Sequence, residues 1–305
     1  MNTISVQING ISKSYKNIKA LDNINLSIKK GELFGFIGPD GAGKTSLFRI
    51  LTTLLFPDEG TAKVEEFDVV ADYKEIRKIA GYMPGRFSLY QDLSVKENLN
   101  FFASIFKTTV QENYELIRDI YSQIEPFKDR LAGNLSGGMK QKLALSCALI
   151  HKPEVLFLDE PTTGVDAVSR KEFWEMLKRL KEKGITILVS TPYMDEASLC
   201  DRVALIQKGK IMSVETPQNI IDNFKYPLAA VQTNNMYELL YDLKQNKDVY
   251  SAFRFGESIH ITEKKSLINT DEIEEYLKLK GHKHIDIKII KPNIEDCFMA
   301  LMEEQ

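Results

Sequence analysis

The chain has 305 residues, of which 43% are hydrophobic and 27% charged, and this ordinary globular composition excludes disordered and collagen-like structure. Its length predicts about two domains. The 40 Lys and Arg residues against 43 Asp and Glu residues give a net charge of -3, so bulk charge does not support a dedicated nucleic-acid binder.

Three scattered cysteines, Cys147, Cys200 and Cys297, form no C-x-x-C pair. This pattern predicts a reduced, cytoplasmic chain without a disulfide framework or a zinc site. The N-terminus lacks the features of a signal peptide, and no apolar run approaches the roughly 18–20 residues that span a bilayer. We therefore expect the chain to be soluble on its own and to reach a membrane only through a partner.

In chain order, hydrophobic periodicity first predicts strands over 4–8, 23–28 and 33–37, then a helix over 44–55. The stretch of about 87–135 is richer in helical patterns and is predicted to be a helical insertion. A helix over 136–150, a buried strand over 155–158, an amphipathic helix over 169–183 and a buried strand over 185–189 follow. Continuous apolar strands joined by a helix imply parallel pairing in a sheet covered on both faces.

The composition changes after Thr216, where the glycine-rich motifs end. Periodicity predicts strands over 228–232, 252–255, 258–261 and 286–290, helices over 236–245 and 271–280, and a last helix starting near Ile294. Asn293 and Asp296 are spaced like a capping box at the start of that helix. The sequence thus predicts a first domain over 1–216 and a small C-terminal α+β domain over 217–305.

A glycine-rich turn between a predicted strand and a predicted helix matches the phosphate-binding pattern G-x-x-x-x-G-K-[ST]. Glycines let backbone N–H groups point at phosphate oxygens, and the following helix adds its positive end. Lys44 would add a charge for the β- and γ-phosphates, and the Thr45 hydroxyl would ligate Mg²⁺. The predicted nucleotide-binding residues of this turn are Gly38, Pro39, Asp40, Gly41, Ala42, Gly43, Lys44, Thr45 and Ser46.

A second pattern is the apolar run 155–158 followed by Asp159 and Glu160. A parallel strand that ends in two carboxylates places them at the sheet edge where α/β proteins bind ligands. Asp159 would hold Mg²⁺, and Glu160 would be the catalytic residue that orients or deprotonates the attacking water. Taken alone, the same residues are equally typical of a solvated strand end.

The segment 135–141, Leu-Ser-Gly-Gly-Met-Lys-Gln, resembles the signature loop of ABC-type ATPases. The resemblance covers about residues 4–216. It implies an α/β P-loop NTPase fold of ABC type, with a mixed sheet core, an antiparallel β subdomain and a helical subdomain, and it implies ATP and Mg²⁺ as cofactors. It also implies that Ser136, Gly137 and Gly138, at a predicted helix N-terminus, act in trans on the nucleotide of an opposing subunit.

Other positions take their roles from the same resemblance. Tyr15 lies where the family stacks an aromatic ring on adenine, and 163–166 resembles the loop that couples two active sites across a dimer. The segment 87–98 lies where the family contacts a transmembrane partner; its apolar residues are either that contact or core: Phe87, Leu89, Tyr90 and Leu93. The segment 291–298 resembles the C-terminal part of drug- or antibiotic-exporter (ABC-2 type) ATPases whose membrane subunits are separate chains, although an ordinary capped helix has the same pattern.

Two positions depart from the family pattern. Gly85 stands where the family has a glutamine that ligates Mg²⁺ and contacts the water, and Pro192 stands where it has a histidine that grips the γ-phosphate. Proline offers neither a side-chain donor nor a backbone N–H. Asp40 adds a carboxylate near the phosphates, which Coulomb repulsion makes unfavourable. The phosphate side of this site is therefore predicted to be degenerate, whereas the signature loop is intact.

The leading interpretation is an ATP-binding subunit of an ABC exporter, the degenerate half of an asymmetric ATPase pair. Its expected partners are integral membrane permease subunits and a second ABC ATPase subunit, with a hetero-dimer favoured over a homo-dimer, and its expected location is cytoplasmic, peripheral on the inner face of the cell membrane. One alternative is a nucleotide-gated regulatory or scaffold module with negligible hydrolysis. A soluble ABC ATPase of DNA repair or translation is a third, and the sequence shows neither the coiled coils nor the second cassette common in that class.

Overall fold

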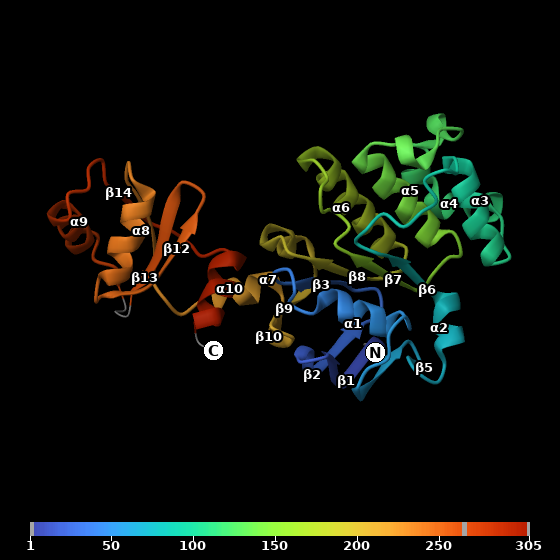
Figure 1. Cartoon of the computed structure of the whole chain (residues 1–305), viewed down its shortest axis with the longest axis horizontal. Helices are drawn as coiled ribbons and strands as arrows, with labels where there is room; N and C mark the ends of the chain where they lie inside the picture. Colours follow the sequence, from blue (N-terminus) through green and yellow to red (C-terminus); the bar gives the residue numbers. More distant parts are fainter. Residues whose placement is uncertain (1–2, 264–266, 304–305) are drawn as a thin grey trace. The chain divides into compact units, whose positions relative to one another are not determined.

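Figure 1 shows the computed structural model, which describes residues 3–263 and 267–303. The chain divides into two compact units, Met1–Thr216 and Pro217–Gln305, and each unit has its own hydrophobic core. Among the described residues, no helix combines the length and the apolar character needed to cross a membrane.

A six-stranded sheet in the order β10-β9-β3-β8-β7-β6 forms the centre of the first unit. Its strands are β3 (Leu33–Ile37), β6 (Ala80–Met83), β7 (Val155–Asp159), β8 (Thr186–Thr191), β9 (Arg202–Gln207) and β10 (Lys210–Glu215). All neighbours pair in parallel except β9 and β10, which are antiparallel. Every residue of β3, β7 and β8 is buried, as expected for continuous apolar strands covered on both faces, so the predicted parallel pairing is confirmed.

A four-stranded antiparallel sheet in the order β2-β1-β4-β5 completes the β structure of this unit. Its strands are β1 (Ile4–Tyr15), β2 (Ile18–Lys29), β4 (Glu59–Val64) and β5 (Phe67–Asp68). β1 is longer than the predicted 4–8 because its pairing with β2 shifts register after Ile8, around Gly10 at φ 67°. Such a bulge breaks the alternation by which a strand is recognised in a sequence.

The helices of the first unit are α1 (Lys44–Leu51), α2 (Tyr73–Ile79), α3 (Val95–Ile105), α4 (Val110–Tyr121), α5 (Gly137–Leu149) and α6 (Ala167–Glu182), with 3-10 turns at Glu125–Phe127, Ala132–Asn134 and Met194–Leu199. α1 ends four residues before the predicted 55, because Thr53 takes a left-handed φ of 62° that an α-helix cannot continue through. The predicted insertion contains α3 and α4, and each begins with a capping box, at Ser94 and Thr109. Figure 1 shows α3, α4 and α5 gathered beside the six-stranded sheet.

Aromatic packing fixes α1 on the six-stranded sheet. Phe48 of α1 meets Phe36 of β3 at 5.5 Å and Phe157 of β7 at 5.9 Å between ring centroids, both edge to face. All three rings are fully buried. Edge-to-face pairs at these distances are favourable beyond their buried area. The N-terminus of α1 is therefore held at the end of β3, beside β7.

The second unit is an antiparallel sheet in the order β12-β13-β11-β14, accompanied by helices. Its elements are α7 (Pro217–Asp222), β11 (Leu228–Gln232), α8 (Met236–Gln245), β12 (Val249–Phe255), β13 (Ser258–Glu263), α9 (Thr270–Leu279), β14 (Asp286–Ile289) and α10 (Ile294–Glu303). The capping pair is present: Asp296 N–H donates to Asn293 Oδ1 and Asn293 N–H donates to Asp296 Oδ2, both at 2.9 Å.

Candidate functional site

The loop between β3 and α1 is shaped by glycines that other residues could not replace. Gly43 has φ 106°, and a Cβ there would lie 2.3 Å from Ala20 O. A Cβ at Gly38 would lie 2.0 Å from Ile206 O. Gly43 is also the N-cap of α1 and provides no side-chain hydrogen bond, so the first amides of α1 remain available to an anion.

Lys44 is buried inside this loop, with 3% of its surface exposed. Its Nζ donates to Gly38 O at 2.7 Å and Pro39 O at 3.0 Å, and it lies 3.6 Å from Glu160 Oε1. Burial lowers the pKa of Lys44, and the nearby carboxylates of Glu160 and Asp40 oppose that shift. A bound phosphate would supply further negative charge to this ammonium, and the loop therefore fits the polyphosphate of a nucleotide.

Thr45 and Asp159 place two oxygen donors side by side. Thr45 Oγ1 donates to Asp159 Oδ1 at 3.1 Å, and Ser190 Oγ donates to the same oxygen at 2.5 Å. Asp159 is buried, with 2% exposed. A hydroxyl and a carboxylate are the hard oxygen ligands that Mg²⁺ takes, so the donor set fits this ion.

Glu160 follows β7 with a left-handed φ of 49°. Its N–H donates to Ser190 O at 3.0 Å and to Ser190 Oγ at 3.1 Å. Its side chain lines a cavity of about 210 Å³ together with Ala20 and residues 41–46. It also lines a cavity of about 180 Å³ with residues 83–88 and 163–165. A carboxylate in this position can accept a proton from a water beside the phosphates.

Gly85 lies close to the backbone of Asp159 and to Glu160, and Pro192 follows the end of the neighbouring strand β8. A Cβ on Gly85 would lie 3.0 Å from Asp159 O and 3.6 Å from Glu160 Cβ. Pro192 directly follows Thr191, the last residue of β8. Neither residue offers a side-chain hydrogen-bond donor to the cavities around Glu160.

Further predicted nucleotide-binding residues lie in or beside the phosphate loop. Tyr15 ends β1 with 43% of its surface exposed, and its hydroxyl lies 3.2 Å from Ser46 Oγ in the first turn of α1. Asp40 is exposed on the loop, and Ala42 N–H donates to Pro39 O at 3.2 Å. The ring of Tyr15 is thus placed beside the loop, with a face open to solvent.

The signature segment begins α5. Ser136 is its N-cap and accepts from Met139 N–H at 3.4 Å. A Cβ on Gly138 would lie 2.9 Å from Ser169 Oγ, so α5 packs closely on the start of α6. The described residues that line the phosphate cavity include none of Ser136, Gly137 and Gly138. The structure therefore brings together the phosphate loop, Asp159 and Glu160. Gly137 lines the neighbouring 180 Å³ cavity that Glu160 also lines, whereas the described lining residues of the two cavities do not include Ser136 or Gly138.

Ser190 is a functional residue that sequence reasoning missed. It pairs with Asp159 in the parallel register of β7 and β8, and its hydroxyl contacts both Asp159 and the Glu160 amide. A signal was available, because Ser190 follows an apolar run that ends at the same edge of a parallel sheet.

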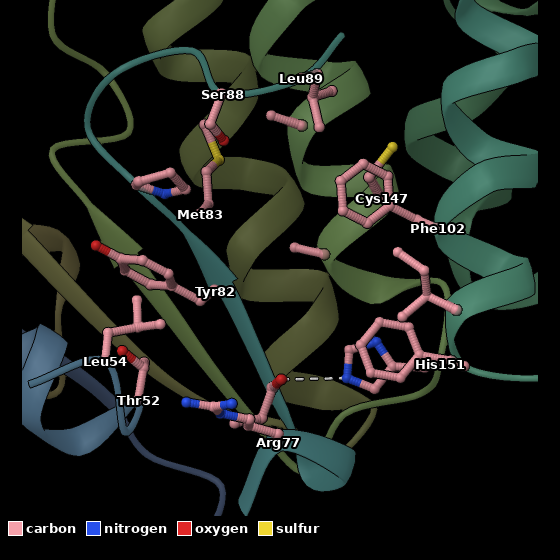
Figure 2. Close-up of a pocket in the computed structure, with 16 residues that line it drawn as sticks. Thr52, Leu54, Arg77, Tyr82, Met83, Ser88, Leu89, Phe102, Cys147 and His151 are labelled. Atoms are coloured by element: carbon pink, nitrogen blue, oxygen red, sulfur yellow. Dashed lines mark hydrogen bonds between the residues drawn. The ribbon is translucent and has the colours of Figure 1, made fainter.

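Figure 2 shows a separate apolar groove of about 420 Å³ in the first unit, bounded by β6, α3 and α5. Leu89, from the segment predicted to contact a membrane partner, lines the groove and is buried. The described residues lining it do not include Phe87, Tyr90 or Leu93. Tyr90 is 48% exposed and packs edge to face on Phe101 at 4.9 Å between ring centroids.

His151 lies at one end of this groove. Its Nε2–H donates to Ala80 O at 3.2 Å, the bond drawn in Figure 2, and its ring stacks on Phe106 with centroids 3.8 Å apart. Burial lowers the pKa of His151 to about 4, so the imidazole is neutral at pH 7. His151 therefore brings no charge to the groove, and Arg77 is the charged side chain among the described lining residues.

The sequence of the chain is similar to those of known transporter proteins. The family model described as ABC transporter matches residues 21–163. The probable multidrug ABC transporter ATP-binding protein YbhF of Escherichia coli (strain K12) is 36% identical over 309 residues, covering 99% of this chain and 53% of YbhF, so the chain spans about half the length of that relative. The Nod factor export ATP-binding protein I of Mesorhizobium japonicum is 32% identical over 303 residues, covering 98% of this chain and 87% of that protein.

Solved structures of ATP-binding cassettes share the fold. CbiO1 from Clostridium perfringens, part of the ABC transporter complex cbiONQ, aligns with a TM-score of 0.65 and 27% identity over 72% of this chain and 92% of its own. The cassette MJ0796, in a dimeric post-hydrolysis state bound to ADP and Pi, aligns with a TM-score of 0.62 and 28% identity over 69% of this chain and 98% of its own. The expected fold of the first unit is thereby confirmed.

Lys44→Ala is expected to weaken ATP binding about 10- to 100-fold, the effect of losing a hydrogen bond from a charged group. Isothermal titration calorimetry with Mg-ATP measures the change. Lys63→Ala is the matched control, because Lys63 is exposed on β4, and it should leave the affinity unchanged. Equal affinities for the two variants would contradict the assignment of the phosphate loop.

Proposed function

Because the chain belongs to the ATP-binding proteins of ABC transporters, we propose that it binds ATP to drive export through separate membrane subunits. One observation supports this most directly: the phosphate loop with Lys44, the Thr45–Asp159 pair and Glu160 meet at one edge of the six-stranded sheet. The names of the relatives, multidrug transport and Nod factor export, favour export as the direction.

Each candidate site residue would have a separate role in binding or hydrolysing ATP. Amides at the start of α1 and the Lys44 ammonium would hold the phosphates of ATP, and the Tyr15 ring would stack on adenine. Thr45 and Asp159 would hold Mg²⁺, which when bound neutralises charge on the phosphate oxygens. Glu160 would take the proton of the attacking water, because it lines the same cavity as the phosphate loop.

We propose further that this chain is the degenerate half of an asymmetric ATPase pair. Gly85 and Pro192 provide no donors beside Glu160, so its own site would bind ATP and hydrolyse it slowly. Ser136, Gly137 and Gly138 lie outside its own phosphate cavity and would complete the site of a second, intact ATPase subunit. A hetero-dimer is therefore favoured over a homo-dimer.

Restoring both sensor residues is expected to raise hydrolysis. The purified chain should turn over ATP slowly, and Gly85→Gln with Pro192→His should raise kcat by on the order of 10²-fold, the usual effect of a catalytic donor. The glutamine requires the backbone at Asp159 to move by a few tenths of an ångström, since its Cβ would start 3.0 Å from Asp159 O. Phosphate release under steady-state conditions measures the change.

Glu160→Gln in the restored chain is the control and should remove the gain. Fast turnover by the unmodified chain, or no gain on restoration, would contradict the degenerate-site proposal.

The same two positions favour a second candidate function, a nucleotide-gated regulatory or scaffold module with negligible hydrolysis. It would bind ATP through Lys44 as the exporter subunit does, but its own site would contribute no turnover to the assembly. Two results together would favour the module over the ATPase subunit. Lys44→Ala would prevent the complex from assembling, and Glu160→Gln would leave transport by the assembled complex unchanged.

The apolar groove of Figure 2 is the surface we propose for a membrane permease subunit. It opens beside the segment 83–89, which also lines a cavity with Glu160, so an occupant would contact the backbone that borders the nucleotide site. Leu54 and Ile105 line the groove with more than half of their surface exposed, so apolar side chains of a permease loop would bury them. Such docking would place the chain on the cytoplasmic side of the membrane as a peripheral subunit.

Ile105→Asp is expected to abolish transport in the assembled complex, because it places a charge in an apolar contact, and to leave ATP affinity within about twofold. Co-purification with the permease and calorimetry with Mg-ATP measure the two effects. Ile4→Asp is the matched control, because Ile4 is also exposed but begins β1 in the antiparallel sheet. Permease binding that survives Ile105→Asp would exclude this groove as the contact.

A further inference from the structure

The turn that carries Glu160 has a strained backbone. Glu160 is not a glycine, yet its φ of 49° lies in the left-handed region. Such a conformation persists only where the surroundings hold it, and it is typical of functional sites. On the N-terminal side, Ser190 holds it by accepting the Glu160 N–H through O at 3.0 Å and Oγ at 3.1 Å.

On the C-terminal side, a buried carboxylate stabilises the backbone conformation of this turn. Glu196, 1% exposed, accepts from Thr162 Oγ1 at 2.7 Å through Oε1 and from Thr191 Oγ1 at 2.6 Å through Oε2. Both threonines are buried, with 1% and 0% of their surface exposed. Arg170 Nε lies 3.8 Å from Oε1 and provides the nearby positive charge. We call Glu196, Thr162 and Thr191 the carboxylate clasp.

The clasp joins the two segments that flank the site. Thr162 lies two residues after Glu160, in a turn where Thr163 N–H donates to Glu160 O and Val165 N–H donates to Thr162 O, both at 3.2 Å. Thr191 is the residue after Ser190, and its Oγ1 also accepts from Tyr193 N–H at 3.0 Å. One carboxylate thereby fixes the turn after β7 to the end of β8.

We propose that Glu196 is a positioning residue that holds Glu160 in its strained, water-facing conformation through Thr162. Without the clasp, the turn 160–165 relaxes toward ordinary backbone angles and the Glu160 carboxylate loses its place beside the phosphate loop. ATP affinity depends on the phosphate loop and Lys44, so loss of the clasp leaves it unchanged. This inference rests on the role proposed for Glu160.

Thr162→Val tests the proposal, because it keeps the shape of the side chain and removes one bond of the clasp. We expect amide exchange over 160–166 to become about tenfold faster and single-turnover hydrolysis about tenfold slower, the effect of one hydrogen bond to a charged group, with the ATP dissociation constant within about twofold. Single-turnover measurement with excess protein registers slow rates. Thr162→Ser keeps the hydroxyl and should restore both readouts.

Thr186→Val is the matched control. Thr186 is fully buried at the opposite end of β8, where its Oγ1 accepts from Gly31 N–H at 3.0 Å. It removes the same hydroxyl from a buried threonine that is not part of the clasp, so it should lower Tm comparably and leave exchange over 160–166 and hydrolysis unchanged. Thr191→Val, which breaks the other bond of the clasp, should act as Thr162→Val does and serves if that variant does not fold.

Three results would overturn the proposal: unchanged exchange over 160–166 in Thr162→Val, equal losses of hydrolysis in Thr162→Val and Thr186→Val, or a Thr162→Ser variant as slow as Thr162→Val. Measurements on Glu160→Gln distinguish a wrong role for the clasp from a wrong role for Glu160. If Glu160→Gln hydrolyses ATP as the unmodified chain does, the role of Glu160 is wrong, whereas the exchange data still decide whether Glu196 holds the turn.

Discussion

Parallel pairing of β3, β8 and β7 is the constraint on which the site depends. In this register Ile37 lies beside Thr191, and Asp159 lies beside Ser190, so three strands end together at one edge. The candidate site residues directly follow these strands. The phosphate loop follows β3, Glu160 follows β7, and the segment with Pro192 follows β8. A slip of one residue between β7 and β8 would separate Asp159 from the Ser190 hydroxyl, because side chains in a strand alternate between faces.

The degeneracy that we propose at positions 85 and 192 would affect this edge selectively. Gly85 and Pro192 change side chains that would act on the terminal phosphate, whereas the backbone of the phosphate loop and the buried Lys44 are intact. Binding energy and rate acceleration use different contacts, since only interactions that strengthen in the transition state raise kcat. In the function proposed here, the phosphate loop and Lys44 would bind the nucleotide, whereas hydrolysis would rely on Glu160 without donors at positions 85 and 192.

Much of this arrangement could be predicted from local sequence patterns. The second unit shows this best: β11 and α8 have the predicted bounds, because β11 is a run of four apolar residues and the apolar residues of α8 recur at helical spacing. β6 was not predicted, because it has only four residues and only Gly81 and Met83 are buried. The family of the chain was identified from four short motifs in order, and the comparisons confirm it.

Contacts between residues that are distant in the sequence could not be predicted from local sequence patterns. Glu196 follows Asp195, whose side chain is 75% exposed, and nothing in the local sequence distinguishes the two carboxylates. Glu196 is buried where it accepts hydrogen bonds from Thr191 and from Thr162, which lies 34 residues away in the chain, in the turn after β7. Gly85 likewise was recognised as a departure from a family pattern, but its closeness to the Asp159 backbone required coordinates.

The ionisable side chains inside the apolar groove have one more consequence. Burial lowers the pKa of His151 to about 4, raises that of Tyr82 to about 12 and raises that of the Cys147 thiol well above its usual range. None of these three groups gains or loses a proton when the interior of a cell becomes moderately acidic or alkaline. A permease subunit that docks in this groove, as proposed, would therefore meet these three side chains in the same protonation state under moderate acid stress as at rest.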